Sequence, residues 1–511
     1  MSNWIIVPVV LPAFTACFLV AALRFQLRWQ RAVSIVSTAM LFGVAIGLYV
    51  LAAAGEPRPY LLGNWPAPFG IVLVLDRLSA LMVLLTSGLA LLVVLYASAG
   101  WDEKGRHFHA LFHFQLLGIN GAFLTGDVFN LFVFFEVLLI ASYGLMLHGG
   151  GPGRLKAGFQ YVAINLVAST VFLFAVGLIY AVTGTLNMAD LAVKVGQVQA
   201  GDVALLRTGA LLLFGVFAVK AALVPLHWWL PMAYAAAPAP SAALFAVMTK
   251  VGAYSILRVY TLIFGAEAGP LADAAAPILL PAALVTLAVG TIGVLASRTL
   301  IELACYSVVT SMGTLLIAVG VFDALSISAA LYYLLHSTLV AAVLFLLVDL
   351  VAERRGRFLG RLIPSPPFGH ALLLGGLFFL TALAMVGLPP LSGFLGKLLI
   401  LDATRDSPQS AAIWWAILGT SLLLTVGFAR AGSVVFWKQG NGRIAGPRTG
   451  GTRVLPISVV LVLLALTAVL SIAAGPIMHE MNLTAEQLLD PARYVRAVLG
   501  GGRAFASAVE L

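Results

Sequence analysis

The sequence contains little charge for its size. Of its 511 residues only 10% are Asp, Glu, Lys or Arg, whereas 61% are hydrophobic, and the mean hydropathy is +1.05. A water-soluble domain does not tolerate this composition, because too few polar side chains remain to cover its surface. The sequence therefore predicts an integral membrane protein and argues against a soluble enzyme or a soluble binding module.

Cysteine is nearly absent as well. Cys17 and Cys305 are the only two, and both lie in or beside apolar segments at no metal-binding spacing. We therefore expect no disulfide, no iron-sulfur cluster and no bound cofactor. No phosphate-binding loop of the GxxxxGK[ST] type is apparent either, so the sequence does not indicate nucleotide hydrolysis as an energy source.

Apolar segments recur along almost the whole chain. A helix needs about 20 apolar residues to cross the hydrocarbon layer of a membrane, and about fourteen segments of this kind can be identified. Their expected limits are 4–23, 33–53, 77–99, 108–125, 128–147, 158–182, 205–225, 240–264, 276–296, 300–320, 326–350, 370–401, 411–436 and 455–475.

The formal net charge of +9 comes from basic residues in the connections between these segments, which favours a membrane orientation signal over nucleic-acid binding. The bases follow odd-numbered segments, and acids such as Asp127 and Asp402 follow even-numbered ones. By the positive-inside rule the odd-to-even connections face the cytoplasm, so both termini should face outward. The bases are Arg24, Arg28, Arg31, Lys104, Arg106, Arg154, Lys156, Arg354, Arg355, Arg357, Arg361, Lys438, Arg443, Arg448 and Arg453.

A few ionisable residues lie inside the apolar segments. Glu136 lies nine residues after Asp127, or about 13 Å along a helix, which places it near mid-membrane. A charge at that depth costs about 3 kcal/mol, so it faces the bundle interior, pairs with a counter-charge or is protonated. The basic candidates for a partner are Lys220, Lys250, His336 and Lys397.

Two interpretations of this set are open. Each group could be a structural link, with Glu136 and a lysine locking two helices together and His336 bridging helices through a hydrogen bond. Alternatively the set forms a relay that moves protons. Burial lowers the pKa of a lysine and raises that of a carboxylate, whereas a nearby opposite charge does the reverse. A buried lysine can therefore release or take up a proton as a neighbouring carboxylate comes and goes. The number of such groups in one bundle favours the relay.

Prolines accompany two of the lysines. Pro225 follows Lys220, and Pro389 and Pro390 precede Lys397, so the helices in segments seven and twelve should be interrupted. The interruptions are five segments apart, which predicts two inverted five-helix repeats, segments 4–8 and 9–13, as in secondary transporters. The expected fold is an all-α bundle of about fourteen transmembrane helices. Its parts would be 1–107, repeats at 108–264 and 276–436, and a last helix with an amphipathic tail at 455–511.

Three stretches identify a family resemblance. They are HFHALFHFQLLGINGAFLTGDVFNLFVFFEVLLIASYGLMLHG, VKAALVPLHWWLPMAYAAAPAPSAALFAVMTKVGAYSILRVY and MVGLPPLSGFLGKLLIL. They resemble the antiporter-like membrane subunits shared by respiratory complex I and the multisubunit Mrp cation/proton antiporters. GNWPAPFGIVLVLDRLSALMVLLTS and DPARYVRAVLG resemble the D-type subunit of the Mrp antiporters. Met232 and Tyr234 stand where complex I subunits usually carry an acid and a histidine.

The resemblance implies roles for the buried residues. Glu136 would be the glutamate of helix five, Lys220 its partner in the broken helix, Lys250 the connecting lysine, His336 the histidine of helix eleven and Lys397 the terminal lysine of helix twelve. Relatives often carry a lysine one turn beyond that histidine, whereas this chain has Val340 and Ala341 there. A link between His336 and Lys397 would then need water or another side chain.

The implied function is exchange of cytoplasmic Na⁺ or K⁺ for external protons, in the plasma membrane of a bacterium. The partners implied are other Mrp-type subunits and membrane lipid, and no nucleic acid. Two alternatives remain open at this point: a proton-pumping subunit of complex I or a related membrane-bound hydrogenase, and a purely structural scaffold subunit.

Overall fold

The computed structural model describes residues 2–438, 440 and 454–509, and among these the side chains from residue 3 to residue 500. The chain is predominantly helical, as predicted. The basic residues Arg443, Arg448 and Arg453 and the end of the C-terminal tail lie outside the described side chains. Twelve helices in the described part are long and apolar enough to cross a membrane.

The helices follow the predicted segments closely. In the first half they are α1 (Val7–Ala21), α2 (Leu27–Ala52), α3 (Arg77–Ala97), α4 (Phe108–Leu124), α5 (Val128–Leu147), α6 (Pro152–Thr183), α7 (Met188–Val195), α8 (Val203–Lys220), α9 (Trp229–Ala236) and α10 (Ala239–Leu262). In the second half they are α11 (Ala276–Ala296), α12 (Leu300–Val319), α13 (Ala324–Arg355), α14 (Ala371–Val386), α15 (Ser392–Ala403), α16 (Ser410–Gly432), α17 (Val454–Ile472), α18 (Ala474–Leu488) and α19 (Pro491–Val509).

Two differences explain why twelve helices, and not fourteen, meet the length criterion. The predicted segment 108–125 forms α4, which has only 17 residues. The predicted segment 370–401 is divided into α14 and α15, of 16 and 12 residues. The predicted segment 205–225 is also shorter than expected, since α8 ends at Lys220. In the last two cases the prolines end the helix earlier than hydropathy alone indicates.

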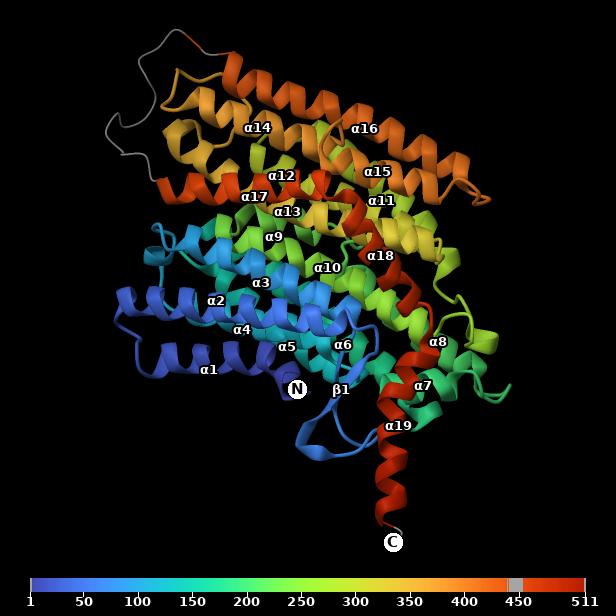
Figure 1. The fold of residues 1–511 in the computed structure, drawn as a ribbon. Coiled ribbons are helices and arrows are strands. Elements are labelled where there is room, and N and C mark those ends of the chain that lie inside the picture. The colour runs from blue at the N-terminus through green and yellow to red at the C-terminus, as the bar shows by residue number, and fades with distance from the viewer. Residues whose placement is uncertain (1, 439, 441–453, 510–511) are drawn as a thin grey trace.

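The long helices run nearly parallel to one another, with α1 and α2 at one edge of the bundle and α14 and α16 at the other (Figure 1). Helix α10 is buried along its whole length, and α13 is almost as buried, whereas only about a third of the residues of α1, α2 and α17 are buried. The two helices that carry Lys250 and His336 therefore form the centre of the bundle.

A short antiparallel hairpin lies at one end of the helices, which we call the hairpin end. It consists of β1 (Arg58–Leu61) and β2 (Val72–Leu75), and it packs beside the N-terminal residues. Asp76 follows β2 directly and begins α3 with a capping box, in which its side chain accepts a hydrogen bond from Ser79 N and Ser79 Oγ accepts one from Asp76 N. The hairpin was not predicted, because its strands have only four residues each.

The last two helices run across the others toward the hairpin end (Figure 1). Helix α18 packs on α13 and α3, and α19 packs on α7 and β1. Gln487 of α18 donates a hydrogen bond to Gly55 O and accepts one from Arg77 N, which fastens α18 to the start of α3. The amphipathic tail that the sequence predicted is therefore helical, and within the described side chains it covers the chain's own hairpin end.

Candidate functional site

Glu136 lies on α5 and faces α6. Its Oε1 accepts a hydrogen bond from the hydroxyl of Ser169 on α6. The carboxylate is partly buried, and it lies close enough to Lys220 of α8 to interact with it electrostatically. The acid that the sequence singled out thus sits between helices, as expected for a charge inside an apolar bundle.

Lys220 is the last residue of α8 and is buried. Its Nζ donates a 2.8 Å hydrogen bond to Asn165 Oδ1 of α6 and lies 5.9 Å from the centre of the Phe135 ring. Among the described residues no ion pair within 4.0 Å joins Glu136 and Lys220. The two groups each contact α6, and not each other.

Helix α6 therefore contributes polar residues that the sequence analysis did not single out. Tyr161, Asn165 and Ser169 are spaced by four residues and lie on one helix face. Tyr161 OH pairs with Ser142 Oγ of α5 at 3.0 Å, and Asn165 Nδ2 donates to Tyr161 O at 2.8 Å. This α6 polar face, defined by these three residues, connects the Glu136 and Lys220 contacts. The four-residue spacing of these residues within the predicted segment 158–182 was the sequence signal that could have identified them.

The first helix break follows Lys220 and covers residues 221–228. Backbone groups freed by the break find partners in neighbouring elements: Val224 N donates to Thr286 Oγ1 of α11 at 2.9 Å, and Val219 O accepts from Trp229 Nε1 at the same distance. Irregular backbone at this depth is stable only when it is satisfied inside the protein. Hydrogen bonds to neighbouring elements thus stabilise the break, which ends α8 at Lys220.

Lys250 lies on α10, directly beside that break. Its Nζ is buried and has no hydrogen-bond partner among the described residues. Two residues later, a Cβ on Gly252 would lie 2.5 Å from Ala221 N and 2.8 Å from the carbonyl carbon of Lys220. Only glycine allows α10 to approach the end of α8 so closely, which brings the Lys250 and Lys220 segments together.

His336 and Lys397 each contact residues at the second break. His336 Nδ1 of α13 pairs with Ser392 Oγ, the first residue of α15, at 2.8 Å. Lys397 of the same short helix donates to Val386 O, the last residue of α14, at 2.7 Å, and to Ser421 Oγ of α16 at 2.8 Å. Helix α15 thus contacts His336 through Ser392 and carries Lys397 itself.

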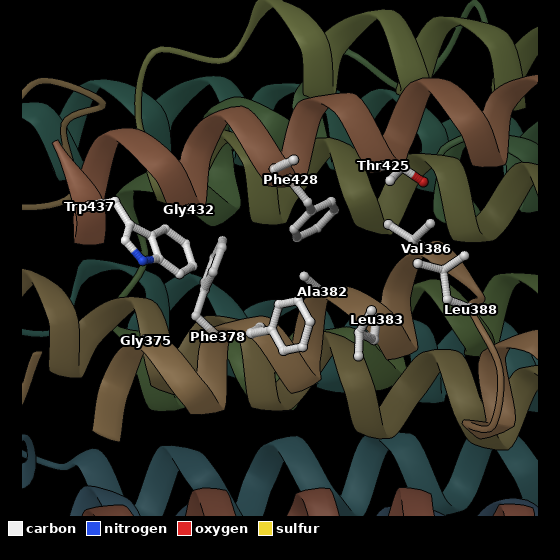
Figure 2. A pocket seen from close by; sticks show the side chains of 12 residues that line it. Gly375, Phe378, Ala382, Leu383, Val386, Leu388, Thr425, Phe428, Gly432 and Trp437 are labelled. Atoms are coloured by element: carbon white, nitrogen blue, oxygen red, sulfur yellow. The ribbon is translucent and has the colours of Figure 1, made fainter. Parts of the chain in front are cut away.

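An apolar cavity of about 140 Å³ lies between α14 and α16 and reaches Val386. Phe378, Phe428 and Trp437 surround it, and Thr425 carries the one hydroxyl group drawn at its wall (Figure 2). None of the described residues that line this cavity is titratable. The five titratable residues predicted from the sequence lie instead on α5, α8, α10, α13 and α15.

A sequence profile of the NADH:quinone oxidoreductase/Mrp antiporter transmembrane family matches residues 125–425. The chain belongs to this family. The matched region contains Glu136, Lys220, Lys250, His336 and Lys397. It begins just before α5 and ends within α16, so all five predicted residues and both helix breaks lie in the part that defines the family.

Full-length relatives include two antiporter subunits of the D type. The chain is 44% identical to the D-type subunit of a probable K⁺/H⁺ antiporter from Rhizobium meliloti (strain 1021), over 99% of each chain. It is 36% identical to the D-type subunit of the Na⁺/H⁺ antiporter from Alkalihalophilus pseudofirmus, over 98% of this chain and 100% of the relative. The resemblance to the D-type subunits is thereby confirmed as a family relationship along the whole chain.

Solved structures of the family share the fold. A chain of the Mrp complex from Dietzia sp. DQ12-45-1b matches with a TM-score of 0.87 and 28% identity, over 98% of this chain and all of that one. A chain of respiratory complex I from Thermus thermophilus matches with a TM-score of 0.77 and 25% identity, over 95% and 99%. The family therefore uses one helix arrangement in complexes of both kinds.

Proposed function

We propose that this chain is the D-type, ion-translocating subunit of a multisubunit monovalent cation/proton antiporter of a bacterial plasma membrane. It would exchange cytoplasmic Na⁺ or K⁺ for external protons, with the proton gradient as its energy source. The relatives named above are K⁺/H⁺ and Na⁺/H⁺ antiporter subunits, which supports a transporter over an enzyme. Its partners would be the other subunits of such a complex, together with membrane lipid.

The observation that carries the proposal is the row of buried titratable groups at the two helix breaks. Lys220 ends the first broken helix, Lys250 lies beside it on the central helix α10, and Lys397 lies just past the second break. Broken helices at mid-membrane mark ion sites in secondary transporters. Lysine cannot coordinate a metal cation, because it carries only proton donors, so this row favours proton movement.

The proton path we propose runs from Glu136 and Lys220 through Lys250 and His336 to Lys397. Glu136 and Lys220 act as the gate of this path, and the α6 polar face holds them in place when they are apart. When the carboxylate approaches the ammonium group, Lys220 keeps its proton; when it withdraws, the cost of the buried charge rises and the proton moves on.

The proposal also includes the membrane orientation of the chain and its two repeats. The odd-to-even connections face the cytoplasm and both termini face outward, which puts the hairpin end on the outer side. The repeats correspond to α4–α10 and α11–α16, and each contains one broken helix, α8–α9 in the first and α14–α15 in the second.

The test is cation-induced collapse of a pH gradient in inverted vesicles from an antiporter-deficient host. The chain is expressed with its neighbouring subunits, without them, and with Glu136→Gln. The exposed Glu267→Gln, in the connection after α10, is the matched control. We expect Na⁺ or K⁺ to collapse the gradient only with the full subunit set and an intact Glu136, with Glu267→Gln unchanged.

Two outcomes would overturn parts of this proposal. Normal exchange by a fully assembled Glu136→Gln complex would remove Glu136 from the path. An assembled complex that ignores Na⁺ and K⁺, but pumps protons when given a reductant and quinone, would assign the chain to a redox-driven pump of the complex I kind.

A further inference from the structure

A second row of polar residues leaves Lys250 along α10, away from the proposed path. Lys250, Tyr254 and Arg258 are spaced by four residues and lie on one face of this fully buried helix. Tyr254 OH donates a 2.6 Å hydrogen bond to Phe123 O of α4, and Arg258 Nε donates to Tyr254 OH at 3.4 Å. The row points toward the hairpin end.

Several buried polar groups that have no hydrogen-bond partner in the described part of the chain lie on the neighbouring helices at about the depth of Lys250. Among the described residues, Thr86 Oγ1 of α3 and both amide atoms of Gln115 of α4 are buried without a hydrogen-bond partner, as Lys250 Nζ is. The three helices pack on one another. Counted from the Arg258–Asp76 and Tyr254–Phe123 contacts at about 1.5 Å per residue, the three groups lie within about one helical turn in depth.

Buried polar groups without protein partners are usually satisfied by internal water. Water at this depth would connect Lys250 to the Tyr254 hydroxyl, which can pass a proton because it both donates and accepts. A proton on Lys250 would then have a direct way out at the hairpin end. An exchanger with such an outlet would lose its gradient without moving a cation.

The outer end of the row is closed by an ion pair. Arg258 and Asp76 lie 2.6 Å apart, and the side chain of each is only 5% exposed. Asp76 is held in turn by Ser79 N. Tyr254 and Tyr494 place their rings 5.6 Å and 5.4 Å from the guanidinium carbon of Arg258, so α19 covers the pair from outside.

A guanidinium group at this point blocks protons in two ways. It keeps its proton at any physiological pH, so it cannot relay one. Its fixed positive charge also repels protons and metal cations, as arginine does in other selective membrane pores. A relay residue such as histidine or glutamate would have the opposite effect.

We propose that the Arg258–Asp76 pair is an electrostatic barrier that prevents protons on Lys250 from leaking outward along α10. It keeps protons on the route toward His336 and Lys397, and so couples proton movement to cation exchange. This barrier rests on the proposed antiporter function, and it adds a role for Arg258, Asp76 and Tyr254.

The test measures proton permeability of proteoliposomes that contain the complete complex, in a pH gradient without Na⁺ or K⁺. Two helical turns, about 12 Å, separate Arg258 from Lys250, and a unit charge at that distance changes local proton occupancy roughly tenfold at an effective dielectric constant of about 20. We therefore expect Arg258→Gln to raise the passive proton leak roughly tenfold. Arg258→Lys, which keeps a positive charge, should leak less.

Removing one member of a buried ion pair leaves the other uncompensated and can prevent folding. The double substitution Arg258→Gln with Asp76→Asn avoids this, because both partners become neutral. It removes the guanidinium group without leaving a lone carboxylate, so its leak should lie between those of the native complex and the single variant. The control is Arg77→Gln with Glu480→Gln, which removes an adjacent 2.7 Å salt bridge at the same end but outside the α10 row. This control should be no more permeable to protons than the native complex.

The leak should disappear when Lys250→Met or Tyr254→Phe is added to the leaky variant, because both interrupt the row. A leak that persists with Lys250→Met would overturn the proposal, since it would arise from general disorder. An assembled double variant with native permeability would overturn it as well. Since the leak is measured without cations, failure of cation exchange in the native complex would count against the proposed function alone.

Discussion

Lys220 Nζ is held by Asn165 Oδ1 at 2.8 Å, while Glu136 is held by Ser169 on the same face of α6. The proposed gate is therefore not a closed ion pair in this structure. Helix α6 holds the acid and the base at separate positions, one helical turn apart. Asn165 and Ser169 thus become the residues that decide how readily the gate closes.

Asn165→Leu should reduce cation exchange roughly tenfold to hundredfold, because a hydrogen bond to a charged group contributes about 1.5–3 kcal/mol. The substitution keeps the size of the side chain but leaves the ammonium group of Lys220 unpaired. Vesicle assays of exchange, normalised to assembled complex, would measure the loss. Thr170→Val on the exposed side of α6 is the control and should behave like the native chain. An Asn165→Leu complex with native exchange would rule out a role for this bond.

Gly252→Ala should destabilise the chain by about 1–3 kcal/mol, because a methyl group forced into a packed contact displaces one of the helices. The added Cβ would meet the backbone of Lys220 and Ala221. Both thermal stability and exchange should fall, since Lys250 and the break after Lys220 would move apart. Gly177→Ala on α6 has nothing within 4 Å and should lower neither. Equal stability of the two variants would contradict the close approach of α10 to α8.

Lys397 should tolerate loss of one partner better than loss of its charge. Ser421→Ala removes one of two hydrogen bonds and leaves the bond to Val386 O, so exchange should fall only a fewfold, because the ammonium group keeps a partner. Lys397→Met should abolish exchange, because it removes the proposed terminal proton site and leaves the Val386 carbonyl unpaired at the break. If Ser421→Ala proved as damaging as Lys397→Met, the hydroxyl would itself be part of the path.

Hydropathy predicted most helix limits within a few residues, because a run of about 20 apolar residues is a strong signal for a membrane helix. The five titratable residues inside apolar segments were equally visible, since a charge in such a run is costly and rare. The α6 polar face was not recognisable from the sequence, because Tyr, Asn and Ser are common in membrane helices and their partners come from other helices. Asn165 can be recognised as the partner of Lys220 only when α6 and α8 are seen side by side.

The ends of the elements were predictable only in part. Asp76, Asp127 and Asp323 begin α3, α5 and α13 by accepting backbone hydrogen bonds, which is a local signal. The interruption after Lys220 was predicted from Pro225, whereas its exact limits, the separate helix α9 and the hairpin depend on contacts between distant segments, such as Thr286 with Val224. Arg258 was not singled out, because its partner Asp76 lies more than 180 residues away.

Asp102 should make a pH-dependent contribution to stability that does not involve the proton path. It lies in the connection between α3 and α4, where Arg31 donates to both of its oxygens at 2.6 and 2.8 Å and His109 Nε2 lies 3.1 Å away. Burial raises the pKa of Asp102, but the hydrogen bonds from Arg31 and His109 outweigh this and bring the pKa to about 2.

Because this pKa lies below the ordinary value of 3.8, the ionised group stabilises the fold above about pH 4, and the contribution is lost as the pH falls toward 2. Asp102→Asn should therefore lower the melting temperature of the detergent-solubilised chain at pH 7, and the difference from the native chain should shrink at pH 3. Glu103→Gln is the matched control: its 2.7 Å bridge to the same Arg31 is exposed, so it should contribute only about 0–1 kcal/mol. A difference between the native chain and Asp102→Asn that stays constant from pH 7 to pH 3 would show that the carboxylate acts through packing and not through its charge.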